Sequence, residues 1–197
     1  MEPLAQSRDP HRETARSAFS AADVEAIALR RGWLRDSGTL LPGAIADAGD
    51  PSPGLAEWMA QAAELLGAQS SDLAGLERLL DRVFSYDAAQ LVARIENQGV
   101  LSREGARDVL RELAARVLDA PAVDSDRLKE IVAALKETTG RRGPELFHPV
   151  RLALAGCAGE GEYDRVILLL DGAARLPWAV AVKGCRQRIL EFCSALD

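Results

Sequence analysis

Histidine and cysteine, the residue types with the widest chemical use, are few in this chain of 197 residues. The two histidines are His11 and His148, and neither belongs to the H-E-x-x-H pattern that places two zinc ligands on one helix face. The three cysteines, Cys157, Cys185 and Cys193, contain no C-x-x-C pair, and their odd number argues against a disulfide framework. We therefore expect no metal and no cofactor. We interpret Cys185 and Cys193 as buried thiols of a protein in a reducing cytoplasm.

Motifs that bind nucleotide phosphates or activate a nucleophile are absent from the sequence. Neither G-x-x-x-x-G-K-[ST] nor a G-x-G-x-x-G between a strand and a helix occurs. The glycines of residues 156–161, GCAGEG, include a glutamate where a phosphate loop needs a cation, so they are typical of a loop or a helix cap. No serine or cysteine lies near a His–carboxylate pattern in the sequence. We expect a protein that is not an enzyme by itself.

The net charge excludes a general attraction for nucleic acid. The chain has 24 basic and 30 acidic residues, a net charge of −6, so any polyanion must be bound by a local patch. Residues 127–151 hold six basic and three acidic side chains and lie between more acidic segments. This segment is either a docking site for a phosphate backbone or a solvated face. Charge alone favours the solvated face.

Helices must position any site, because apolar residues recur at helical spacing through most of the chain. Ser20 and Asp23 have the form of a capping box, and Gly32 ends the apolar run that follows them. Further helical stripes run through residues 55–66, 73–83, 91–95, 109–118, 128–135 and 166–170. The pattern at residues 178–182 fits either a helix or a strand. The fold class is therefore all-α, with about eight or nine short helices.

Polar caps and breaks mark where several of these helices begin and end. Ser102 is the predicted N-cap of the stripe at residues 109–118. Asp124 or Ser125 caps the next stripe, and Gly140 ends it.

The segments outside the stripes are expected to be irregular. Residues 1–17 are polar and predict a flexible tail, and residues 35–54 predict a long connection with room for one short turn near residues 40–45. No apolar run approaches the roughly 18 residues of a membrane span, and no signal peptide is visible. We expect a cytoplasmic protein without a membrane partner.

One short segment carries a family resemblance. Residues 146–156, LFHPVRLALAG, resemble the pattern L-F-x-P-L-R-x-A-L-T-G of the C-terminal anticodon-binding region of bacterial glutamyl-tRNA synthetase, and differ chiefly at Val150 and Ala155. Residues 55–80, 84–87 and 102–118 resemble the helices and the aromatic junction upstream more weakly. The resemblance covers roughly residues 18–195, and it implies two small helical subdomains, residues 18–88 and 89–197.

The resemblance implies a non-catalytic tRNA-binding protein and a set of RNA contacts. Arg151 is expected to contact a base or a phosphate, Arg141 and Arg142 to contact phosphates, Tyr163 to stack on a base, and Gln69 to replace an arginine weakly. Read without the family, the motif places a proline in the first turn of a helix and projects Arg151 from that turn. The alternative is that Arg151 pairs with an acidic neighbour inside the fold.

The sequence also departs from the family pattern. The catalytic domain, with its H-I-G-H-like and K-M-S-K-S-like signatures, is absent. Residues 67–69 read Gly-Ala-Gln where the family has R-x-R, and residues 159–164 bring three carboxylates to a loop that is neutral in the family. The initial Met and the dissimilar tail favour a free-standing protein, which then serves a separate synthetase catalytic chain. The alternative function is a repurposed protein-interaction module that has lost tRNA binding.

Overall fold

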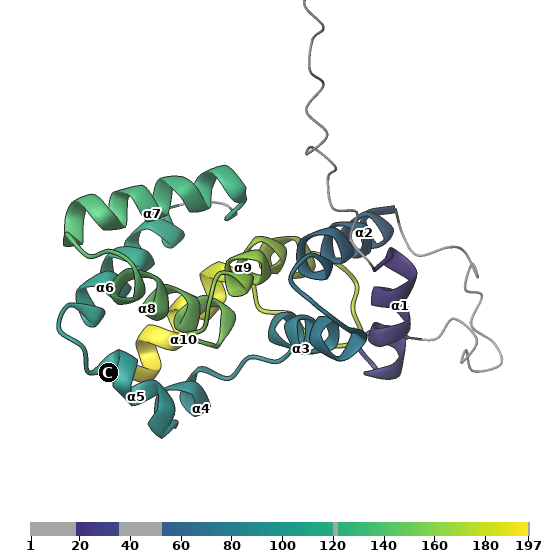
Figure 1. The fold of residues 1–197 in the computed structure, drawn as a ribbon, viewed down its shortest axis with the longest axis horizontal. Coiled ribbons are helices and arrows are strands. Elements are labelled where there is room, and N and C mark those ends of the chain that lie inside the picture. The colour runs from purple at the N-terminus through teal and green to yellow at the C-terminus, as the bar shows by residue number, and fades with distance from the viewer. Residues whose placement is uncertain (1–18, 36–52, 120–121, 197) are drawn as a thin grey trace, which may run out of the picture.

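All regular structure in the described part of the chain is helical, as the apolar periodicity predicts (Figure 1). The computed structural model describes residues 19–35, 53–119 and 122–196. The expected tail at residues 1–17 and the expected turn at residues 40–45 lie outside these ranges. The helices are α1 Ala21–Arg30, α2 Pro53–Gly67, α3 Leu73–Phe84, α4 Ala88–Ala93, α5 Ile95–Leu101, α6 Ala106–Leu118, α7 Ser125–Thr139, α8 Pro144–Ala155, α9 Glu162–Ala173 and α10 Cys185–Leu196. Not one of these described helices is long and apolar enough to cross a membrane.

The start of α1 and both ends of α7 confirm the predicted caps. The Asp23 carboxylate accepts a hydrogen bond of 2.8 Å from the backbone N–H of Ser20, the N-cap of α1. Asp124, rather than Ser125, caps α7 and accepts from the backbone N–H groups of residues 126 and 127 at 3.1 and 2.8 Å. Gly140 ends α7 in the left-handed region at φ +67°, where a side chain would be strained.

The N-cap of α7 provides a direct test of this part of the fold. We expect Asp124→Ala to lower the free energy of unfolding by about 1 kcal/mol, because two helix N–H groups lose their acceptor. Equilibrium unfolding in urea measures the change. The matched control is Glu137→Ala, an exposed acidic residue of the same helix, which is expected to change stability by less than about 0.5 kcal/mol. Equal effects of the two substitutions would contradict the capping role.

Two predicted helix starts are wrong. Ser102 ends α5 instead of capping the next helix, and α6 begins at Ala106 after Gly105, whose φ of +80° makes residues 102–105 a turn. The proline in the first turn of α8 is Pro144, and Pro149 lies inside the helix. Gly143, with φ +54°, turns the chain just before Pro144, so Pro144 takes the first position, where its missing N–H has no helical partner to lose.

The stripe at residues 91–95 is also divided differently from the prediction. The chain is extended at Arg94, with ψ 128°, so two short helices, α4 and α5, replace one. This break brings the number of helices in the described ranges to ten rather than eight or nine. The stripe at residues 166–170 forms a helix as predicted and lies within α9.

Helix α9 lies in the middle of the molecule (Figure 1). It packs against α2 and α3 on one side and against α8 on the other, while α10 packs against α4, α6 and α8. The ambiguous residues 178–182 form neither helix nor strand, and Trp178 packs its ring edge-on against Trp58 and Phe84 at centroid distances of 5.0 and 4.8 Å. Residues from both proposed subdomains therefore share one core, and the division at residue 88 stays a prediction.

A buried cation joins the ends of two helices to α10. Arg188 is 0% exposed, and its Nε donates to the carbonyl of Lys183 at 2.8 Å. Its Nη1 donates to the carbonyls of Arg82 and Leu154 at 2.9 and 2.8 Å, and its Nη2 to that of Val83 at 2.6 Å. Three of these carbonyls belong to the last turns of α3 and α8, whose dipoles are negative at that end. Burial lowers the pKa of Arg188 to about 10, which still leaves it charged at neutral pH.

Candidate functional site

Arg151, the central residue of the family motif, is engaged inside the fold. It lies in the middle of α8 and is 8% exposed. Its Nε and Nη2 donate to the two carboxylate oxygens of Asp164 at 2.7 and 2.9 Å, and its Nη1 donates to the carbonyl of Gly159 at 2.8 Å. The guanidinium carbon lies 5.0 Å from the centre of the Phe147 ring. The interpretation in which Arg151 pairs with an acidic neighbour therefore describes this geometry, and the hydrogen bonds that Arg151 donates to Asp164 raise the pKa of Arg151.

The loop between α8 and α9 sets this arrangement. Gly156 ends α8 with φ +72°, which confirms a helix cap at the first glycine of the cluster. A Cβ at Gly159 would collide with the ring of Tyr163, so the loop backbone lies directly against that ring. Tyr163 is half-buried, and burial raises its pKa to about 12. One part of the ring is therefore covered by the chain itself.

The turn between α7 and α8 carries the two other predicted arginines. Arg141 lies 3.3 Å from Glu104 and 3.4 Å from Glu145 through its two terminal nitrogens. Arg142 is exposed and forms no ion pair with any of the residues that the structure describes. Of the predicted cations, Arg142 is thus the one most accessible to an anion.

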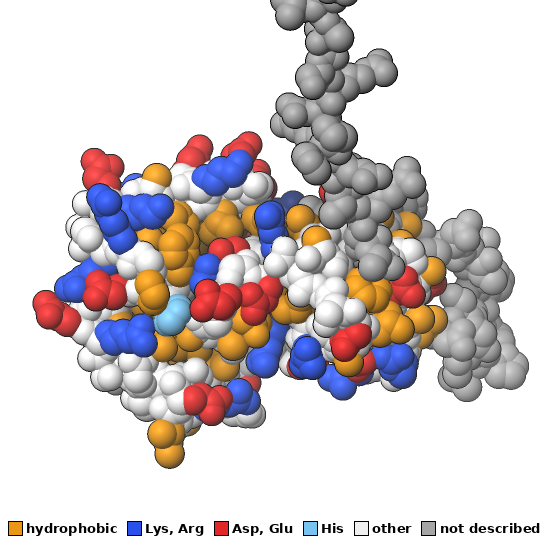
Figure 2. Space-filling model, viewed as in Figure 1, with side chains coloured by type: hydrophobic (Ala, Val, Ile, Leu, Met, Phe, Trp, Pro, Cys, Tyr) orange, Lys and Arg blue, Asp and Glu red, His pale blue; other side chains and the backbone are white. Residues whose placement is uncertain are grey.

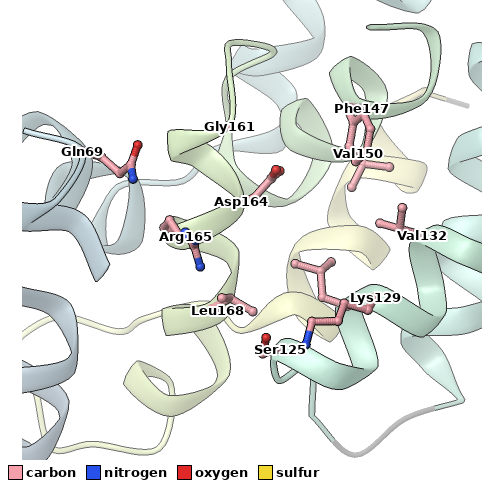
Figure 3. Close-up of a pocket in the computed structure, with 11 residues that line it drawn as sticks. Gln69, Ser125, Lys129, Val132, Phe147, Val150, Gly161, Asp164, Arg165 and Leu168 are labelled. Atoms are coloured by element: carbon pink, nitrogen blue, oxygen red, sulfur yellow. The ribbon is translucent and has the colours of Figure 1, made fainter. Parts of the chain in front are cut away.

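Gln69, just beyond the end of α2, borders a hollow of about 510 Å³. Figure 3 shows Gln69 and Arg165 on one side of this hollow and Phe147, Val150 and Val132 on the other, with Asp164 between them. The lining thus combines an aromatic ring and aliphatic side chains with a few polar groups, as small-molecule and base pockets do.

The structure places the five predicted residues at three locations. Gln69 lines the hollow, Arg151 and Tyr163 flank the α8–α9 loop beside it, and Arg141 and Arg142 lie on the α7–α8 turn. The sequence patterns did not point to Arg165, an exposed arginine of α9 that lines the same hollow. Its position next to Asp164 in the first turn of α9 is the signal that was available.

The described residues contain no cluster of three or more side chains suited to a metal ion. Cys185 is buried and its pKa is raised by that burial, as expected for an inert thiol, whereas Cys157 and Cys193 are only partly buried. His148 lies on α8 near Arg103, with 3.2 Å between its Nδ1 and the Arg103 Nη1.

These features define an all-helical domain with a basic turn between α7 and α8 and a hollow lined by α7, α8 and α9. The sequence profile of the family described as "Anticodon binding domain" matches residues 39–161, more than half of the chain, and the chain belongs to this family. The match ends before α9, so Asp164, which holds Arg151, lies outside it.

The curated relatives are ligases that charge tRNA with glutamate. A glutamate–tRNA ligase of Geobacillus stearothermophilus is 35% identical over 75 residues, which are 38% of this chain and 15% of the ligase. That of Bacillus subtilis is 29% identical over 114 residues, 58% of this chain and 23% of the ligase. Glutamate–tRNA ligase 2 of Syntrophus aciditrophicus is 35% identical over 71 residues, 36% of this chain and 15% of the ligase. No solved structure matches significantly. The resemblance to bacterial glutamyl-tRNA synthetase is thus confirmed, and the matched segments span less than a quarter of the ligases' length.

Proposed function

We propose that this protein binds tRNA without catalysing aminoacylation itself. The observation that carries the proposal is the α7–α8 turn, which lies within the segment matching the anticodon-binding family and presents Arg142 to solvent without an ion-pair partner among the described residues. A guanidinium is permanently charged and its planar donors fit a phosphate. Arg142 would bind the RNA backbone at this turn, with Arg141 beside it.

The hollow lined by α7, α8 and α9 supplies the second part of the proposal. Its volume of about 510 Å³ accommodates a base that has left its stack, with Phe147 as an apolar wall and with Gln69 and Arg165 as hydrogen-bonding groups. Tyr163 would stack on a neighbouring base with the open part of its ring. Arg151 would act mainly by holding the loop that shapes this wall, because all three of its nitrogens already donate to protein groups.

A separate catalytic chain would complete the activity that this protein lacks. The ligases that it resembles match it over less than a quarter of their length. We propose that the protein acts in the cytoplasm and presents tRNA to such a chain.

The competing function is a protein-interaction module. The ion pair between Arg151 and Asp164 favours this function. Asp164 neutralises Arg151, and Glu160 and Glu162 bring further negative charge to the same loop. Carboxylates there would repel an RNA backbone and would suit a basic protein surface.

Titration with total tRNA distinguishes the two functions. We expect the wild-type protein to bind at about 50 mM salt and to lose affinity steeply by about 200 mM, because binding releases counterions from the RNA. We expect Arg142→Gln to weaken binding by about threefold to tenfold. The slope of log affinity against log salt concentration should become smaller by about one. Arg175→Gln, an exposed arginine after the end of α9, is the matched control with the same change of charge. The absence of tRNA binding at low salt would exclude the proposal and leave the interaction module.

A further inference from the structure

Two turns that are far apart in sequence meet on one surface of the protein. The guanidinium of Arg141, in the α7–α8 turn, covers Gly105 in the turn before α6, where a Cβ would lie 2.6 Å from Arg141 Nε. Arg141 also pairs with Glu104 of that turn at 3.3 Å, across 37 residues of sequence. Cations of the α5–α6 turn therefore adjoin those of the α7–α8 turn.

The α5–α6 side of this junction contributes two more arginines. Arg103 and Arg107 line a hollow of about 420 Å³ together with Gly105 and Gln98. Both arginines are exposed, and neither forms an ion pair within residues 19–35, 53–119 and 122–196. Two guanidinium groups held on one turn and one helix start are well placed to contact neighbouring anionic groups.

His148 adds a titratable group to the same surface. Since a guanidinium nitrogen is always a donor, the contact of 3.2 Å between Arg103 Nη1 and His148 Nδ1 makes the imidazole an acceptor, which requires its neutral form. The charged groups that face the ring are Arg103 from the α5–α6 turn, Arg151 from its own helix and Glu160 from the α8–α9 loop. Burial lowers the pKa of His148, and the two arginines lower it further against the opposing effect of Glu160.

Figure 2 shows this part of the surface from the front. The pale-blue histidine has blue side chains on the side of α5 and α6 and red ones on the side of α9. The basic surface is therefore bordered by the acidic α8–α9 loop, and an extended polyanion would be guided along the two turns rather than across that loop.

We infer that Arg103, Arg107 and His148 form a binding site for the phosphate backbone of RNA, continuous with Arg142 on the neighbouring turn. The inference rests on the proposed function and names a second place where the same partner binds. A backbone of repeated phosphates fits the site better than a single anion, because the cations extend over two adjoining turns instead of converging on one point. The Glu104 and Glu145 carboxylates are held by Arg141, so they oppose this partner less than free carboxylates would.

The first test is tRNA binding by the full chain with both arginines replaced. We expect Arg103→Gln combined with Arg107→Gln to weaken binding about tenfold at 0.1 M salt and to lower the slope of log affinity against log salt by about two. The control pair is Arg175→Gln combined with Arg78→Gln, which removes the same charge from other elements and is expected to leave the slope unchanged. If wild type binds tRNA and the Arg103/Arg107 variant binds it with the same slope, the inference is wrong and the proposed function stands. If wild type binds no tRNA, both are wrong.

The second test uses the proton on His148. A phosphate beside the ring favours the imidazolium, so binding takes up a proton, and affinity for tRNA rises as the pH falls from about 7.5 to about 5.5. We expect His148→Gln to remove this rise, so that the affinity of the variant no longer increases as the pH falls. An unchanged pH profile in the variant would overturn the inference. So would displacement of tRNA by polyglutamate of equal charge, because the site would then recognise carboxylates as well as phosphates.

Discussion

Arg188→Met is expected to lower the free energy of unfolding by about 4 kcal/mol, because a buried carbonyl left without a donor costs about 1–3 kcal/mol. The guanidinium supplies donors to four backbone carbonyls, and the thioether supplies none. The last turns of α3 and α8 would also lose the positive charge on which their negative dipole ends converge. A loss of this size is a large part of the roughly 5–15 kcal/mol that stabilises a domain.

Urea unfolding followed by far-UV circular dichroism measures the effect of Arg188→Met. The matched control is Gln187→Met, one position earlier in α10 and exposed, for which we expect a change below about 0.5 kcal/mol. Arg188→Lys should fall between the two, because an ammonium reaches fewer carbonyls than the guanidinium fork does. A loss below about 1 kcal/mol in Arg188→Met would show that the carbonyls find other partners.

Asp164→Asn is expected to have the second largest effect, through the ion pair with Arg151. The pair is bidentate and Arg151 is 8% exposed, so removing the carboxylate charge leaves a largely buried guanidinium without compensation. We expect a loss of about 2–3 kcal/mol, somewhat less than for a fully buried pair because the Asp164 side chain is 33% exposed. If the proposed function holds, tRNA affinity would rise about threefold to tenfold, because one negative charge is removed from the lining of the hollow.

Glu162→Gln is the charge-matched control for Asp164→Asn, since it removes one negative charge from the same turn of α9 without touching the pair. We expect it to leave stability within about 0.5 kcal/mol and to raise tRNA affinity by less than Asp164→Asn does. A double-mutant cycle with Arg151→Met isolates the coupling, and a coupling energy near zero would contradict the structural role of the pair.

The helices could be predicted from sequence where local patterns decide them. The capping box at Ser20, the cap at Asp124 and the left-handed Gly140 each depend on residues within one turn of the helix end. The start of α8 could not be located from Pro149 alone, because Pro144 competes for the first position and the φ of Gly143 decides between them. Local rules for helix starts thus fail where two residues that both favour the first helical position lie within two turns of each other.

The candidate site was harder to predict, because its contacts are tertiary. The pattern places Arg151 correctly on a helix after the basic turn, but its partner Asp164 is 13 residues away and lies on another helix. Arg188 occupies the apolar stripe formed by Cys185, Ile189 and Phe192, and this misplaced charge was a visible sign of a buried cation. The carbonyls that accept hydrogen bonds from Arg188 lie up to 106 residues away in the sequence, and no sequence spacing indicates them.

The order in which a ribosome makes the chain determines when the buried cation of α10, Arg188, can form its hydrogen bonds. The carbonyls at the ends of α3 and α8 are synthesised well before the arginine that donates hydrogen bonds to them. Until α10 has emerged, both helix ends lack this donor and the core between them stays open to water. We therefore expect the helices formed early in synthesis to reach their final packing only when α10 has emerged, so that the fold is completed late in synthesis.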